Sequence, residues 1–131
     1  MPQPRVAGLS IVVTDMARAL AFYRMCGVDT PASADAQPHA ESVLPGGFRL
    51  MFDTVEVIRS FQPGWQAPKG GHRAALALDC GRPTEVDALH QQLVAAGHHS
   101  EMAPFDAFWG QRYAIVADPD GNPVDLFAAL D

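Results

Sequence analysis

The segment FWGQRYAIVADPDGNPVDLFA, Phe108–Ala128, carries the strongest structural pattern in this chain. Two apolar stretches, residues 110–117 and 122–130, are predicted as strands because their apolar residues alternate with other residues at a period of two. The letters DPDGN between them predict a tight turn, since proline fixes one backbone angle and glycine permits a positive one. Asp125 lies between two apolar residues, so its side chain is predicted to point away from the core.

The same order of elements, a strand and a helix followed by further strands, occurs twice along the chain. Asp15 and Thr84 are predicted to cap the two helices, and Gly27 and Gly97 to end them. The two glycines lie 70 residues apart (97 − 27), which indicates two pseudo-symmetric halves. The remaining predicted elements are strands at 5–13, 46–53 and 72–79 and helices at 14–27 and 82–97.

Length and composition predict one compact domain, residues 1–131, because 48% hydrophobic content is enough to bury a core. Its first module is predicted at 5–53, with weak, proline-broken strand material at 28–45. Residues 54–71 are rich in proline and glycine and are predicted as a linker, and the second module follows at 72–129.

Charge excludes several classes of partner. A formal charge of −6 argues against nucleic acid and against anionic membranes, since both require a basic surface. No apolar run approaches the roughly 20 residues that span a bilayer, and no signal peptide is recognised, so a cytoplasmic location is expected. Cys26 and Cys80 have no CxxC spacing and are predicted as reduced thiols, while the isolated His39 and His90 receive no role.

Two stretches carry a resemblance to a known family. LSIVVTDMARALAFY, Leu9–Tyr23, and DPDGNPVDLF, Asp118–Phe127, within the doubled order of elements, resemble the vicinal oxygen chelate superfamily, which includes glyoxalase I, extradiol dioxygenases and bleomycin-resistance proteins. The resemblance implies an α+β fold of two tandem βαβββ modules, which form a curved, cup-shaped mixed sheet with helices on its outer face. It also implies a ligand site in the concave cup, and a homodimer.

Metal-dependent members of that family carry ligands on the first and last strands of each module. Seven residues before Asp15 the resemblance places the first ligand at Gly8, which has no side chain to bind a metal. On strand 46–53 the apolar alternation turns Arg49, Met51 and Asp53 toward the cup. Neither arginine nor methionine replaces a hard carboxylate, and Asp53 lies at the strand end.

The second module supplies one clear candidate ligand. Asp125 occupies the position of the family's closing carboxylate. His72 shares the parity of the core leucines on strand 72–79, which turns Arg73 toward the cup, but a shift of one residue would reverse both side chains. If a metal such as nickel, zinc or iron is present, His72, Asp125 and Asp53 would be its ligands. A catalytic metal usually needs three protein ligands. One clear carboxylate, one histidine of undecided direction and no donor on the first strand fall short of that number, so no metal cofactor is predicted.

Without a metal, Asp125 is predicted to pair with Arg73, with Arg49 or with a cationic ligand, or to stay hydrated. Aromatic residues in predicted loops complete the candidate binding site. Phe108 and Trp109 lie in one loop and Trp65 in the linker, where they can stack on a ligand or pack against the protein itself. Tyr113 alternates against its apolar neighbours and either offers its hydroxyl to the cup or fills space.

These residues favour a metal-free protein of the glyoxalase/bleomycin-resistance type that binds an aromatic or charged small molecule in the cup. The expected ligand-binding residues are Asp125, Trp109, Arg49, Met51, Arg73, Tyr113, Trp65 and Phe108. The alternative is a metal-dependent lyase, isomerase or dioxygenase of the same superfamily. The expected partners are a small-molecule ligand and a second copy of the chain.

Overall fold

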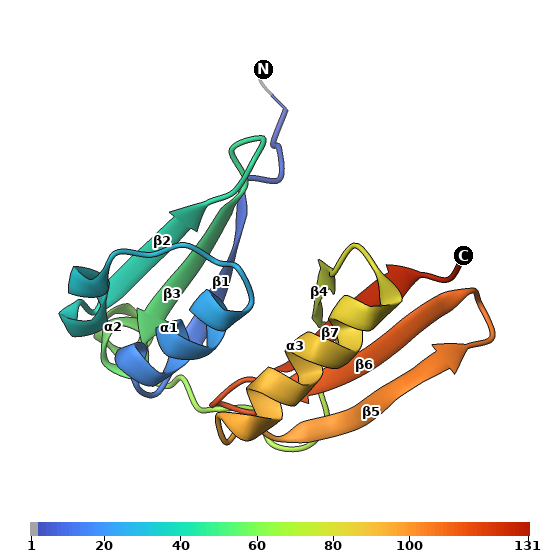
Figure 1. Ribbon diagram of the computed structural model, residues 1–131. Coiled ribbons are helices and arrows are strands. Elements are labelled where there is room, and N and C mark those ends of the chain that lie inside the picture. The colour runs from blue at the N-terminus through green and yellow to red at the C-terminus, as the bar shows by residue number, and fades with distance from the viewer. Residues whose placement is uncertain (1–2) are drawn as a thin grey trace. The chain divides into compact units, whose positions relative to one another are not determined.

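The computed structural model describes residues 3–131, and the chain divides into two compact units, Met1–Pro68 and Lys69–Asp131 (Figure 1). Each unit pairs a mixed sheet with helices, which confirms the predicted α+β class. The first unit contains β1 (Gly8–Val13), α1 (Met16–Met25), the 3-10 helix η1 (Ala32–Ala36), β2 (His39–Val43), β3 (Arg49–Thr54) and α2 (Val55–Phe61). The second contains β4 (Leu76–Asp79), α3 (Pro83–Ala95), β5 (Ser100–Ala107), β6 (Gln111–Ala117) and β7 (Pro123–Ala129).

The first unit is built on a three-stranded sheet in the order β1-β3-β2. β1 runs parallel to β3, and β2 runs antiparallel to it. Leu50 and Phe52 of β3 are fully buried, and the ring of Phe52 lies 5.1 Å from that of Tyr23 on α1, measured between centroids. α1 therefore covers the face of β3 that the apolar alternation predicted as core.

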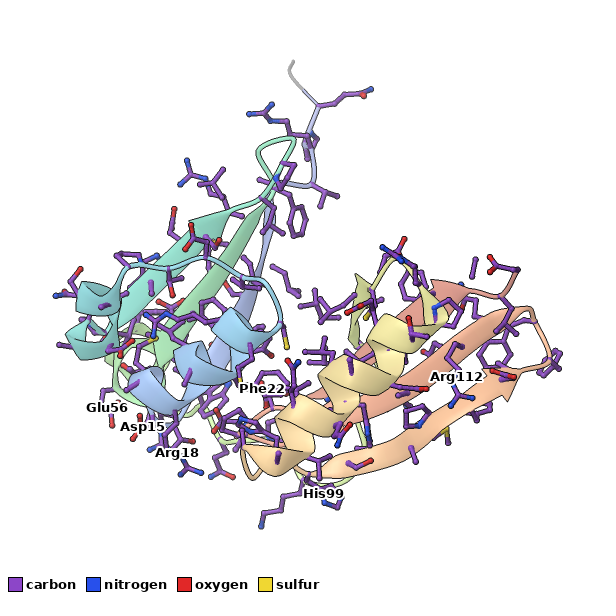
Figure 2. All side chains as sticks on the ribbon, in the orientation of Figure 1. Asp15, Arg18, Phe22, Glu56, His99 and Arg112 are labelled. Carbon is purple, nitrogen blue, oxygen red and sulfur yellow. The ribbon has the colours of Figure 1, made fainter. Side chains whose placement is uncertain are left out.

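The ends of α1 are those predicted. Asp15 accepts a hydrogen bond of 3.0 Å from the backbone amide of Arg18, which satisfies one of the free amides of the first turn (Figure 2). Gly27 follows the helix with φ of 88°, a conformation that glycine adopts without a steric penalty.

The second unit is built on a four-stranded sheet in the order β4-β7-β6-β5, with α3 packed on one face. Val116, Val124 and Leu126 are fully buried under the helix, as is Leu93 of α3. Within this sheet β4 pairs with β7 in parallel, and the β5–β6 and β6–β7 pairs are antiparallel. Among residues 3–131 no helix is long and apolar enough to cross a membrane.

One predicted end of α3 is correct and the other is wrong. Gly97 has φ of 97° and ends the helix as predicted. Thr84 does not cap it, because α3 begins one residue earlier, at Pro83, with Arg82 as the N-cap. Proline suits this first position, since the amide hydrogen that it lacks would have no partner there.

The predicted strand 72–79 is observed only in its second half, as β4. Leu76, the first residue of β4, pairs with Val124 of the parallel strand β7. The residue before Val124 is Pro123, which has no amide hydrogen to donate to residues before Leu76. The ladder ends at this point, and His72 and Arg73 lie exposed in the irregular chain before the strand. The prediction of a strand at residues 72–75 is therefore wrong, and strand alternation does not set the direction of either side chain. The contribution of Arg73 to the cup stays a prediction.

The first module also differs from its predicted outline. Residues 28–45 form η1 and a single strand, β2, so the sheet of the first unit has three strands rather than four. The predicted linker 54–71 begins with a helix, α2, whose N-cap Thr54 accepts a hydrogen bond of 3.4 Å from the amide of Val57. The boundary between the two units falls in the remainder of this segment.

The pairing of β1 with β3 requires glycine at position 8. Gly8 lies opposite Arg49 in the parallel ladder. A Cβ atom at position 8 would overlap the backbone carbonyl oxygen of Arg49 and would lie 3.1 Å from Cε of Met51. A backbone oxygen cannot move aside without distorting the ladder. No donor side chain can therefore stand where the family resemblance places the first metal ligand.

We expect Gly8→Ala to lower the free energy of unfolding by about 1–3 kcal/mol, the usual cost of inserting an atom into a filled space. Denaturant unfolding of both proteins measures this difference. Gly64→Ala is the matched control, because a Cβ atom there meets nothing within 4 Å and the φ of Gly64 is not in the left-handed region. Equal stability of the two variants would contradict the close approach of β1 and β3.

Candidate functional site

The second unit exposes the open face of its sheet, meaning the face turned away from α3. Cross-strand neighbours place Tyr113 beside Phe105 on one side and Phe127 on the other, and Ile115 beside Asp125. All five side chains are half-buried, whereas the residues between them on β6 and β7 include the fully buried core. Asp125 and Tyr113 thus lie on the face that alternation predicted for them.

Four aromatic residues, Phe105, Phe108, Trp109 and Tyr113, form a cluster at the β5–β6 hairpin, called here the aromatic cluster. The ring centroid of Trp109 lies 5.0 Å from that of Phe108, 5.3 Å from that of Tyr113 and 6.2 Å from that of Phe105. All three pairs are edge to face, a favourable arrangement of ring quadrupoles. Nε1 of Trp109 donates a hydrogen bond of 2.8 Å to Gln111, which fixes the plane of the indole.

Much of this aromatic surface remains in contact with water. Phe108 is 97% exposed and Trp109 is 49% exposed, although both are large apolar side chains. Two adjacent aromatic rings left uncovered at one end of a sheet are typical of a binding surface. Phe105 joins the cluster through both Trp109 and Tyr113.

Asp125 is held by Tyr113 rather than by an arginine. The hydroxyl of Tyr113 donates a short hydrogen bond to Oδ2 of Asp125. Burial, and then the hydrogen bond and negative charge of Asp125, raise the pKa of Tyr113 to about 12, so the phenol keeps its proton at neutral pH. Arg49, one of the partners predicted for Asp125, donates to Glu41 of its own unit at 2.5 Å.

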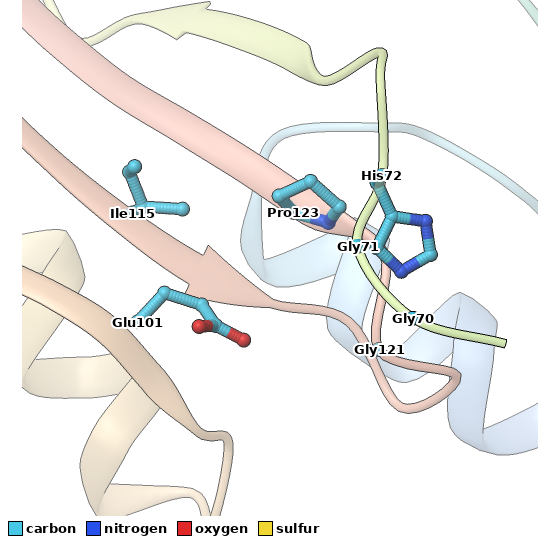
Figure 3. A pocket seen from close by; sticks show the side chains of 7 residues that line it. All are labelled: Gly70, Gly71, His72, Glu101, Ile115, Gly121 and Pro123. Atoms are coloured by element: carbon cyan, nitrogen blue, oxygen red, sulfur yellow. The ribbon is translucent and has the colours of Figure 1, made fainter.

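A pocket of about 390 Å³ adjoins the open face of the second sheet (Figure 3). His72 and Glu101 are its ionisable residues, and Ile115 connects it to the open face because Ile115 lies opposite Asp125. His72 thus borders a pocket, although it does so from the loop before β4 and not from a strand. The other lining residues are Gly70, Gly71, Gly121 and Pro123.

The first unit places four ionisable side chains on the face of its sheet turned away from α1, in what is called here the charge network. Arg49 donates to Oε1 of Glu41 at 2.5 Å, and Oε2 of Glu41 lies 2.9 Å from Nε2 of His39. Nδ1 of His39 lies 2.5 Å from Oδ1 of Asp53. Met51 lies on the same face, beside Glu41 of β2. Arg49, Met51 and Asp53 therefore face away from the core, as predicted.

Both ring nitrogens of His39 face carboxylates, and a carboxylate can only accept. The hydrogen bonds to Glu41 and then Asp53 raise the pKa of His39, because they favour the imidazolium, which donates from both nitrogens. The hydrogen bond from His39 lowers the pKa of Glu41 for the same reason. The geometry therefore favours the protonated ring, because only that form donates to both carboxylates.

His39 is the site residue that the sequence analysis missed. It lies 14 residues from Asp53 along the chain, and only the antiparallel pairing of β2 with β3 brings the two side chains together. A signal was present in the letters HAESV, residues 39–43, where His39 and Glu41 alternate with small residues. That period of two indicates that His39 and Glu41 share one face of a strand.

Within the part of the chain that the structure describes, the donor side chains do not gather into a site for a divalent metal. Throughout the described residues 3–131, no group of three His, Cys, Asp or Glu side chains could hold a metal ion. Nδ1 and Nε2 of His39 point away from each other, so Asp53 and Glu41 do not converge with the ring on one point. Among residues 3–131, His72, Asp125 and Glu101 do not form a group that could hold a metal.

Trp65 serves a local purpose in the first unit. Arg59 of α2 donates a hydrogen bond of 3.2 Å to the carbonyl oxygen of Trp65, and its guanidinium carbon lies 5.9 Å from the centre of a Trp65 ring. This cation–π contact holds the chain that follows α2 against the helix. Arg59 therefore already covers part of the Trp65 ring that was predicted to contact a ligand.

Comparison with known proteins identifies the family. The sequence model of the Glyoxalase/Bleomycin resistance protein/Dioxygenase superfamily matches residues 5–126. A glyoxalase/bleomycin resistance protein/dioxygenase family enzyme from Burkholderia phytofirmans PsJN is 21% identical, with a TM-score of 0.81 over 97% of this chain and 100% of that chain. A glyoxalase-related enzyme from Fulvimarina pelagi is 24% identical, with a TM-score of 0.78 over 96% of this chain and 88% of that chain.

A glyoxalase/bleomycin resistance protein/dioxygenase from Nocardioides is 22% identical, with a TM-score of 0.72 over 100% of this chain and 87% of that chain. A search of curated protein sequences found no significant match. The similar structures show a shared fold, and the sequence match spans nearly the whole chain. The resemblance noted in the sequence is thus confirmed, and the chain belongs to the glyoxalase/bleomycin resistance protein/dioxygenase superfamily.

Proposed function

We propose that this protein binds a small planar molecule on the open face of the second sheet, without a metal. The observation that carries the proposal is the aromatic cluster beside the hydrogen bond from Tyr113 to Asp125. Aromatic side chains bind planar ligands by stacking, and a small number of polar groups then fixes their orientation. The exposed rings of Phe108 and Trp109 supply the stacking surface, and Asp125 supplies a polar group that fixes the orientation of the ligand.

The charge of this face favours a cationic ligand over an anionic one. Asp125 lies on the face and Glu101 in the adjoining pocket, whereas no lysine or arginine occupies a paired strand position of the face. Arg112 of β6 turns to the other side, where it donates to Asp87 of α3 at 3.0 Å (Figure 2). A cation over an aromatic ring gains roughly 0.5–2 kcal/mol, with more gained as water is excluded.

The competing function is that of a metal-dependent lyase, isomerase or dioxygenase. One observation favours it, since His72 borders the same pocket as Ile115, and Ile115 lies beside Asp125. A histidine and a carboxylate are two of the three protein ligands that a catalytic site usually needs. Among residues 3–131, however, these side chains and Glu101 of the same pocket do not form a group that could hold a metal, which is the reason to prefer binding without one.

We expect a planar cation such as N-methylacridinium to quench the fluorescence of Trp109 saturably. The Trp65→Phe variant makes this measurement specific, because the sequence contains two tryptophans. Trp109→Ala should weaken binding about tenfold, since a stacked or cation–π contact contributes roughly 1–2 kcal/mol. The fluorescence of the probe itself reports binding in this variant.

Trp65→Ala is the matched control for that experiment and should leave the affinity unchanged. A planar anion, 2-naphthalenesulfonate, should bind less tightly than the cation because Asp125 repels it. Equal affinities of Trp109→Ala and the parent protein for N-methylacridinium would contradict the proposed position of the ligand.

Protein purified without added metal is expected to contain far less than one equivalent of nickel, zinc or iron, because three donors do not converge on one point. Elemental analysis of the wild-type chain and of Asp125→Ala measures this. A stoichiometric metal that disappears in Asp125→Ala would favour the enzyme over the binding protein.

A further inference from the structure

We propose that two basic side chains, Arg49 and His39, hold the carboxylates of the first sheet in the place of a divalent metal. The open face of this sheet is then a closed charge network and not a metal site that lacks its ion. The inference concerns the first unit and does not rest on the ligand proposed for the second.

The first strand contributes no strong donor to this face. Its residues there are Gly8, Ser10 and Val12, which lie opposite Arg49, Met51 and Asp53 of β3. A side chain at position 8 is excluded by the carbonyl oxygen of Arg49. The first-strand ligand that the family resemblance implies is therefore missing for a steric reason, and it cannot be restored by substitution alone.

The carboxylates on this face already have their counter-charges. One oxygen of Glu41 accepts from Arg49 and the other lies beside Nε2 of His39, while Asp53 lies beside Nδ1. Arg49 and the ring of His39 thus occupy the carboxylate oxygens that a divalent cation would need as ligands. Both nitrogens of His39 are engaged, so the ring has no free lone pair for a metal.

A metal could enter only by displacing these groups. The side chain of Asp53 is 15% exposed, so a carboxylate that lost its partner there would keep most of the cost of desolvation. The charged residues of α2 do not supply another partner. α2, which packs against β1 and β3, carries Glu56 and Arg59, and Arg59 is bonded to the Trp65 carbonyl.

Thermal unfolding at low ionic strength, with EDTA or with added Mn²⁺, tests the proposal on the full chain. Mn²⁺ is chosen because hard cations prefer carboxylate oxygen. We expect the Tm of the wild-type protein to change with neither addition. The double variant Arg49→Met/His39→Gln leaves Glu41 and Asp53 without cations, so it should unfold at a lower temperature. Mn²⁺ at ten times its dissociation constant should then raise that Tm by roughly 3 °C or more.

Arg59→Met is the matched control, because it removes an arginine of the same unit that donates to a backbone carbonyl oxygen, and it should not create a response to Mn²⁺. A wild-type Tm that rises with Mn²⁺ and falls with EDTA would overturn the inference, as would a double variant that ignores Mn²⁺. If the double variant does not fold, Arg49→Met and the wild-type measurement decide the question. A metal response of the wild type with unchanged binding of N-methylacridinium would defeat this inference alone and leave the proposed function standing.

Discussion

Strand side chains in this protein alternate between a face buried under α1 or α3 and a face turned away from that helix. The rest of the structure depends on this constraint. Burial fixes the register of each strand, because a slip of one residue would turn Leu50 or Leu126 to water. The same register then decides which side chains gather on the opposite face. Functional residues are thus positioned by the apolar residues between them, such as Val124 and Leu126 on either side of Asp125.

The two units share an order of elements but fill their open faces differently. On the first sheet, Arg49 and His39 alternate with carboxylates in a line of neutralising contacts. On the second, rings from β5 and the β5–β6 hairpin cluster around Tyr113 of β6, whose hydroxyl donates to the carboxylate of Asp125. The first arrangement satisfies its own charges, whereas the second leaves Phe108 and Trp109 exposed. This contrast is why the proposed ligand belongs to the second sheet.

Membership in the glyoxalase/bleomycin resistance protein/dioxygenase superfamily does not by itself assign an activity. The family name joins enzymes to binding proteins, and the difference between them lies in individual side chains. Gly8 is informative because the backbone carbonyl oxygen of Arg49 leaves no room for a side chain at this position. Asp125 is informative because its hydrogen bond to Tyr113 gives the carboxylate a purpose other than metal binding.

The sequence by itself determined the elements whose signals are local. The caps of α1, the glycines that end both long helices and the faces of β3 and β7 follow from spacing over a few residues. What only the tertiary structure decided depends on strand partners far along the chain. The β4–β7 pairing ends beside Pro123, so β4 is shorter than predicted and does not include His72. The pairing of β2 with β3 brings His39 next to Asp53. Alternation fixes the face on which a side chain lies, but its contacts depend on which strand lies alongside.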